Sequence, residues 1–164
     1  CLINKQKTLK RLADLKGLNL EKAQFAFFVK NFDLLSNYVR PIDNPTFKLL
    51  KRGLPGPYTF ILPTLKLPKP FQKRKSIGIR ISDHPILNEL LGLLTVPLIT
   101  TSLHDTDKIV DYTTDPAVIF ERWGKNIDLM MDDGFGGNIP STVIDLCKKE
   151  PVVIRKGKGP LNIL

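Results

Sequence analysis

The sequence predicts an α/β fold, a single domain in which helices flank a twisted, mixed β-sheet. Short apolar runs that fit buried strands alternate with longer segments whose apolar residues recur at helical spacing. Prolines and short links between the later strands favour a mixed sheet over a doubly wound parallel one. With 164 residues, the chain is long enough for one domain with a full core.

Helix and strand signals alternate along most of the chain. Gly17 and Gly124 end two helices, and Asn44 and Asp115 are expected N-caps, each followed by a proline. The expected helices cover residues 4–16, 32–39, 44–53, 85–94 and 116–123. The expected strands cover residues 25–29, 58–62, 76–81, 96–101, 127–131, 142–146 and 151–155. Three prolines and several basic residues predict a loop over 63–75.

Composition limits the class of protein. The chain is 42% hydrophobic and 25% charged, as in ordinary soluble proteins, and no apolar run approaches the roughly 20 residues of a bilayer span. Two cysteines, Cys1 and Cys147, are too few for a disulfide framework, so we expect free thiols, a cytoplasmic location and no membrane association. Because the chain starts at Cys1 without a methionine, we also expect a native N-terminal segment upstream.

Basic residues are concentrated in the first half of the chain. Residues 1–82 contain 17 Lys and Arg against 4 Asp and Glu, a formal charge of +13, whereas residues 83–164 contain 8 against 12, a charge of −4. This asymmetry favours a polyanionic partner such as RNA, because Lys and Arg displace counterions from phosphates. A solvated basic face that aids solubility is the alternative interpretation.

Common catalytic and phosphate-binding motifs are missing. The chain has neither a GxxxxGK[ST] loop nor a GxGxxG segment that opens a helix. His84 and His104 do not have the spacing of zinc ligands, so we expect no structural metal. Metal and thiol chemistry are therefore not predicted.

Polar side chains lie at the ends of several apolar strands. The set comprises Ser76, Arg80, Thr100, Thr101, Ser102, Ser141, Thr142 and Arg155. Open α/β sheets place ligands at strand ends, and hydroxyl and guanidinium groups suit phosphate and carboxylate recognition. Arg80 alternates with Ile79 and Ile81 and should face away from them, with a surface salt bridge as its alternative role. As a group, these residues predict an anion pocket.

The same segments carry a family resemblance. Four motifs occur in order, at 57–62 (PYTFIL), 77–85 (IGIRISDHP), 97–102 (PLITTS) and 140–145 (PSTVID) leading to IRKG at 154–157. Together they resemble the YrdC/YciO family of threonylcarbamoyl-AMP synthase-like domains over nearly all of residues 1–164. The resemblance implies a YrdC-like fold with a basic concave face. It also implies a nucleotidyltransferase that builds threonylcarbamoyl-AMP from L-threonine, bicarbonate and ATP for tRNA modification, and in some members binding of double-stranded RNA or tRNA.

The resemblance also implies roles for individual residues. The nucleotide, ATP with Mg²⁺ as its phosphate counterion, would contact Ser76, Ser102 and Arg155. The amino acid L-threonine would contact Arg80, Thr100 and Ser141. Catalytic roles would belong to Lys16, Ser102 and His104. Lys16 matches the lysine of a Lys-x-Arg motif, and His104 is a candidate general base because an unperturbed imidazole titrates near neutral pH.

Departures from the family pattern leave the activity open. Leu18 stands where synthases carry the arginine of Lys-x-Arg, and an apolar side chain cannot neutralise a triphosphate. His104 stands where they carry asparagine, and we expect their N-terminal proline-threonine-aspartate-threonine segment to lie upstream of Cys1. This pattern is closest to the YciO branch. We expect a nucleotide- and RNA-binding protein that makes or breaks threonylcarbamoyl-AMP-type adducts, with a non-catalytic RNA-binding module that keeps a vestigial nucleotide pocket as the alternative.

Overall fold

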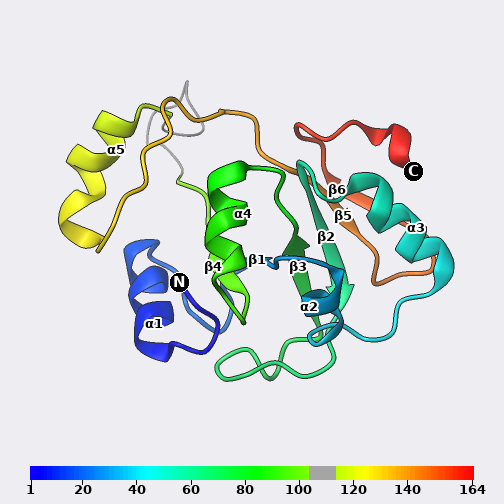
Figure 1. Cartoon of the computed structure of the whole chain (residues 1–164). Coiled ribbons are helices and arrows are strands. Elements are labelled where there is room, and N and C mark those ends of the chain that lie inside the picture. The colour runs from blue at the N-terminus through cyan, green and yellow to red at the C-terminus, as the bar shows by residue number, and fades with distance from the viewer. Residues whose placement is uncertain (104–113) are drawn as a thin grey trace. The chain divides into compact units, whose positions relative to one another are not determined.

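The computed structural model describes residues 1–103 and 114–164 (Figure 1). Their contacts divide the chain into two compact units, residues 1–100 with 141–164, and residues 101–140. The second unit contains α5 (Pro116–Trp123) and a 3₁₀ turn (Gly124–Asn126). The first unit contains the β-sheet and all of its strands.

The first unit contains a mixed sheet, as the sequence predicts, and its six strands lie in the order β4-β1-β3-β2-β5-β6. Its strands are β1 (Ala26–Phe28), β2 (Tyr58–Pro63), β3 (Ser76–Arg80), β4 (Leu98–Thr100), β5 (Thr142–Asp145) and β6 (Val152–Arg155). The pairs β1–β3 and β2–β5 are parallel, and the other neighbours are antiparallel. One end of the sheet therefore collects the carboxyl ends of β1, β3 and β6 and the amino ends of β2, β4 and β5.

Four helices accompany this sheet, namely α1 (Gln6–Leu15), α2 (Phe32–Ser36), α3 (Asn44–Gly53) and α4 (Pro85–Gly92). The predicted N-cap of α3 was wrong by one residue. Asp43 is the cap, because its extended backbone lets the side chain accept a hydrogen bond from the Thr46 amide at 2.8 Å. Among the described residues, no helix has the length and hydropathy needed to cross a bilayer.

The hydrophobic core covers one face of the sheet. Phe27, Phe60, Ile79 and Ile144 are at most 1% exposed, and they join one cluster with side chains from α1, α2 and α3. Alternation places the neighbouring residues of each strand on the opposite face. On that opposite face, Phe28 is buried but does not belong to the core cluster. The second face of the sheet is therefore separate from the hydrophobic core.

The loop between β2 and β3 contains a buried anchor. Phe71 is fully buried and packs edge-on against Phe27, with ring centroids 5.4 Å apart. The guanidinium of Arg74 lies 4.6 Å from the centroid of Phe71 and donates to the carbonyl of Ala23. These contacts hold the predicted loop against the segment that follows α1.

One prediction from apolar spacing was wrong. Residues 127–131 do not form a strand, and Leu129 and Met131 are 77% and 52% exposed. A strand needs a neighbour for its backbone hydrogen bonds, and no strand occurs among the described residues of the second unit.

Candidate functional site

Arg80 ends β3 on the sheet face opposite the core. Ile79 and Ile81 are buried, as the predicted alternation requires. The guanidinium lies 4.6 Å from the ring centroid of Phe28, its partner in the β1–β3 register. The Nε of Arg80 is buried and finds no hydrogen-bond acceptor among the described residues. Arg80 therefore presents an unsatisfied donor at the end of the sheet.

Arg155 reaches the same end of the sheet from β6. Its Nε and Nη2 donate to the carbonyl of Ser141 at 3.1 and 2.8 Å, and Nη2 also lies 3.3 Å from the Ser141 hydroxyl. That hydroxyl is 2.8 Å from the hydroxyl of Thr59. Because Phe60 pairs with Ile79, Thr59 lies beside Arg80 across β2 and β3. We call the group of Phe28, Thr59, Arg80, Ser141 and Arg155 the two-arginine site.

Two positive charges make this site attractive to an anion. Burial lowers the pKa of Arg80, the charge of Arg155 lowers it further, and Asp83 opposes both effects. A guanidinium held in such surroundings is stabilised by an opposite charge. Carboxylate and phosphate oxygens match guanidinium geometry, so the site can hold either group.

The segment after Arg155 is fastened to the sheet. Thr142 is fully buried, and its hydroxyl donates to the Gly159 carbonyl at 2.6 Å and accepts from the Gly157 amide at 3.0 Å. The Tyr58 hydroxyl donates to the Pro160 carbonyl at 2.7 Å. Gly159 is required at this contact, since a Cβ there would lie 2.5 Å from the Tyr58 ring. Arg155 thus extends from a fixed backbone.

Ser76 and Thr100 lie on the same sheet face as Arg80 but away from Arg155. Ser76 begins β3, and four residue steps of about 3.3 Å separate it from Arg80. Thr100 pairs with Ala26, and its hydroxyl donates to the Ala26 carbonyl at 3.4 Å. The structure therefore gathers Arg80, Ser141 and Arg155 of the predicted set and leaves Ser76 and Thr100 nearer the other end of the sheet. Their contacts with a ligand stay predictions.

The predicted catalytic residues have different surroundings. Lys16 is half-buried and caps the end of α1, where the amides of Gly17 and Leu18 donate to the Asp14 and Ala13 carbonyls. Leu18 is 42% exposed. Ser102 belongs to the second unit, and His104 lies outside the described residues.

Cys147 follows β5 at the end of the sheet that also holds Ser76. Its pKa is raised to about 11 by burial, and a hydrogen bond and the charge of Asp145 add to this effect, whereas a hydrogen bond with Ser76 opposes it. Cys1 and Cys147 are both free thiols. A thiol with this pKa is a poor nucleophile at neutral pH.

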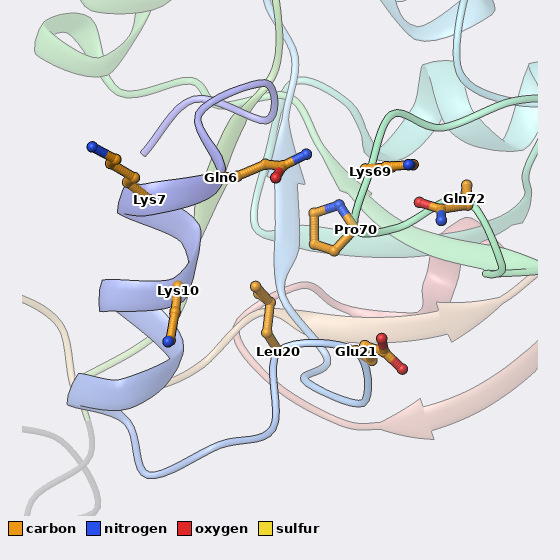
Figure 2. A pocket seen from close by; sticks show the side chains of 8 residues that line it. All are labelled: Gln6, Lys7, Lys10, Leu20, Glu21, Lys69, Pro70 and Gln72. Carbon is orange, nitrogen blue, oxygen red and sulfur yellow. The ribbon is translucent and has the colours of Figure 1, made fainter.

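A second basic feature lies between α1 and the β2–β3 loop (Figure 2). This lysine pocket has a volume of about 490 Å³, and its lining residues are Gln6, Lys7, Lys10, Leu20, Glu21, Lys69, Pro70 and Gln72. Arg74 joins its two sides, because its guanidinium also approaches the carbonyls of Leu20 and Glu21 at 3.5 and 3.4 Å. The charge count predicted a basic first half of the chain but not this pocket.

Sequence reasoning missed Thr59 and Phe28 as members of the two-arginine site. Both fit an ordinary strand, because threonine and phenylalanine are common in sheets. The PYTFIL motif, which contains Thr59, was the available signal. Its meaning depends on the pairing of β2 with both β3 and β5, which a single sequence does not show.

Comparisons with known proteins agree with the motifs. A family model named for Sua5, YciO and YrdC and described as "Telomere recombination" matches residues 1–157. YciO of Escherichia coli K12 is 36% identical over 99% of this chain and 79% of its own length, and the crystal structure of E. coli YciO matches with a TM-score of 0.88.

Two further matches name a ligand or an activity. The crystal structure of Pyrococcus abyssi Sua5 complexed with L-threonine matches with a TM-score of 0.84 and 25% identity, over 99% of this chain and 48% of Sua5. The threonylcarbamoyl-AMP synthase of Buchnera aphidicola is 26% identical over 89% of this chain and 84% of its own length. The chain belongs to the Sua5/YciO/YrdC family, and its fold is YrdC-like.

Proposed function

We propose that the two-arginine site binds L-threonine through its carboxylate, with Arg80 as the main partner and the Ser141 hydroxyl as a second donor. The observation that carries this proposal is the buried Nε of Arg80, which lacks an acceptor among the described residues. A bound carboxylate would supply that acceptor together with a compensating charge. The L-threonine complex of the related Sua5 structure supports the choice of amino acid.

The proposed reaction joins this amino acid to a nucleotide. The threonine amino group and bicarbonate would form a carbamate with loss of water, and the carbamate oxygen would displace pyrophosphate from ATP to give threonylcarbamoyl-AMP, or the reverse. Arg155 is exposed and sits beside Ser141, so it would meet a phosphate next to the amino acid. The synthase of B. aphidicola supports this reaction class. ATP, with Mg²⁺ as its counterion, would then be a substrate, and the cytoplasm, where tRNA is modified, would be the place of action.

Calorimetric titration with L-threonine tests the binding step. We expect Arg80→Lys to weaken binding at least tenfold, because one ammonium cannot replace a forked guanidinium. Ser141→Ala should weaken it by roughly fivefold to tenfold through one lost hydrogen bond. Arg52→Lys is the matched control, since Arg52 is an exposed residue of α3 that donates to the Ile163 carbonyl. Equal effects of Arg80→Lys and Arg52→Lys would contradict the proposal.

The catalytic step is tested separately through Leu18. Purified protein is assayed for formation and for consumption of threonylcarbamoyl-AMP, and for action on modified tRNA. Leu18 is partly exposed, so Leu18→Arg should fold normally and restore a guanidinium where the synthases carry one. We expect this variant to raise synthase activity over the wild type. If neither protein shows activity but both bind L-threonine, the proposed reaction is wrong and the binding proposal stands.

The lysine pocket favours a second candidate function, an RNA-binding module. Lys7, Lys10 and Lys69 line one cavity, whose lining contains a single acidic residue, Glu21. Charge reversal or neutralisation there should weaken binding of tRNA or double-stranded RNA if the basic surface contacts phosphates. We expect the triple variant Lys7→Gln, Lys10→Gln, Lys69→Gln to lose at least tenfold in RNA affinity in a filter-binding assay.

The matched control neutralises two exposed lysines of the acidic half, Lys148→Gln with Lys149→Gln. This double variant should retain most of the RNA affinity. Equal losses in the two variants would indicate attraction by net charge alone, without a defined RNA surface. Unchanged affinity in the triple variant would remove the lysine pocket from the interface.

A further inference from the structure

The contact between Thr59 and Ser141 joins two hydroxyl groups, of which either can donate. Their oxygens are 2.8 Å apart, and Arg155 Nη2 lies 3.3 Å from the Ser141 oxygen. A hydroxyl group has one proton to donate and two lone pairs that accept. The direction of this hydrogen bond therefore decides which residue keeps a free proton for a ligand.

Burial determines the direction. Thr59 is only 9% exposed, and Ser141 is the single hydrogen-bond partner of its hydroxyl among the described residues. If Ser141 donated, the Thr59 proton would be buried without an acceptor, which is costly. If Thr59 donates, the free proton belongs to Ser141, which is half-buried and open to the site. The second arrangement satisfies the buried residue.

We propose that Thr59 is a positioning residue, which donates to the Ser141 oxygen so that the Ser141 proton is directed at the bound anion. Thr59 and Arg155 occupy both lone pairs of the Ser141 hydroxyl, so that its proton is the only part left to bind a ligand. The ligand identity rests on the proposed function, in which the anion is the L-threonine carboxylate. The direction of the hydrogen bond does not depend on that identity.

Gly78 leaves room for the rotamer that Thr59 adopts. A Cβ at Gly78 would lie 3.0 Å from the Thr59 methyl carbon, so the absence of a side chain leaves room for that methyl group. The threonine is β-branched and has few allowed rotamers. With the methyl over Gly78, the hydroxyl is left pointing at Ser141. Gly78→Ala should therefore disturb the hydrogen bond without removing the hydroxyl.

Neutron diffraction of deuterium-exchanged crystals tests the direction without any ligand. We expect a deuteron on the Thr59 oxygen that points at Ser141, and a second deuteron on Ser141 that points away from Thr59. A deuteron on Ser141 that points at Thr59 would overturn the proposal. Failure of the wild type to bind L-threonine would count against the proposed ligand alone, since the neutron map reads the hydrogen bond independently.

Titration with L-threonine tests the consequence. Thr59→Val should lower the affinity by roughly fivefold to tenfold, the effect of one misdirected hydrogen bond. Thr59→Ser keeps the hydroxyl and should bind L-threonine within about twofold of the wild type. In the Ser141→Ala background, Thr59→Val should have no further effect, because the two residues act as one unit. A merely structural role predicts equal losses in both backgrounds, and that result would contradict the proposal.

Thr64→Val is the matched control. The Thr64 hydroxyl is also buried, but it donates to the Arg74 carbonyl just beyond the other end of β2. This variant should lower the thermal midpoint without changing the affinity for L-threonine. A loss of affinity equal to that of Thr59→Val would show that destabilisation explains both results.

Discussion

At the scale of single residues, Arg80 combines a functional position with unfavourable burial. Its guanidinium has Phe28 as a ring partner, but its Nε lacks an acceptor among the described residues. Burial and Arg155 lower the pKa of Arg80, so the charged form is less favourable in the folded chain than in the unfolded one. The charge therefore works against stability at every pH at which arginine is protonated.

Replacing Arg80 by an uncharged residue should raise stability and abolish L-threonine binding. Arg80→Met keeps a long side chain against Phe28 and removes the buried cation. We expect the free energy of unfolding to rise by about 1 kcal/mol, because an apolar group replaces a cation whose burial outweighs its contacts with Phe28 and the charge of Asp83. Denaturant unfolding measures that change, and calorimetry should show loss of L-threonine binding in the same variant. A large drop in stability would mean that Arg80 has a structural partner that compensates its charge.

The thiol of Cys147 gives a prediction that depends on pH. Its pKa of about 11 leaves very little thiolate at pH 8, so alkylation should be roughly two orders of magnitude slower than for an ordinary cysteine. Iodoacetamide labelling of the Cys1→Ser variant measures this rate with one thiol present. The rate should rise as the pH approaches 11, and Asp145→Asn should accelerate it at pH 8. Rapid labelling at pH 8 would show that the surroundings of Cys147, an exposed residue, do not raise its pKa.

At the scale of elements, the end of α1 positions the segment that carries Lys16 and Leu18. Gly17 has a φ of 61°, a left-handed conformation that residues with a Cβ adopt at a cost. No atom lies within 4 Å of a Cβ built on Gly17, so the cost of Gly17→Ala is conformational only. We expect a loss of about 1 kcal/mol in the free energy of unfolding, measured by urea denaturation.

Gly159→Ala provides the contrast for that measurement. A Cβ there would overlap the Tyr58 ring, so this variant should destabilise the chain more than Gly17→Ala does. It should also weaken ligand binding, since the Thr142 and Tyr58 contacts fix the backbone after Arg155. A smaller loss than that of Gly17→Ala would show that the C-terminal segment is not fastened to the sheet.

Local patterns predicted most elements but could not predict pairing. The strands β2, β3 and β5 follow from apolar runs, and alternation along β3 placed Arg80 on the correct face. The strand expected at 127–131 failed because an apolar run forms a strand only beside a partner. Thr59 was missed for the same reason, since its role arises from the register between β2 and two neighbours.

At the scale of the whole molecule, the strand directions explain which predicted site residues meet. Arg80 and Arg155 lie at carboxyl ends, and Ser141 precedes a strand that runs the opposite way, so the mixed sheet brings all three to one end. Ser76 begins its strand and so lies toward the other end. Residue types in the sequence predict an anion site, but which residues form that site depends on strand order and strand direction.

The basic half of the chain leads to a prediction about ionic strength. If its lysines and arginines contact phosphates, the logarithm of RNA affinity should fall linearly with the logarithm of salt concentration, with a slope of about −0.7 to −0.9 per contact. The Lys7, Lys10 and Lys69 triple variant should reduce the slope by about two to three. Arg80→Met should leave it nearly unchanged, because Arg80 is half-buried in the two-arginine site and lies outside the lysine pocket. A slope near zero for the wild type would exclude phosphate contacts.

The central claim is that the two-arginine site binds a carboxylate, and removal of that group from the ligand tests it most directly. Calorimetric titration would compare L-threonine with L-threoninol, in which an alcohol replaces the carboxylate. We predict that the wild type binds L-threonine at least tenfold more tightly than L-threoninol, and that Arg80→Met reduces this ratio to near one. Equal affinities of the wild type for the two ligands, or a ratio unchanged by Arg80→Met, would contradict the account.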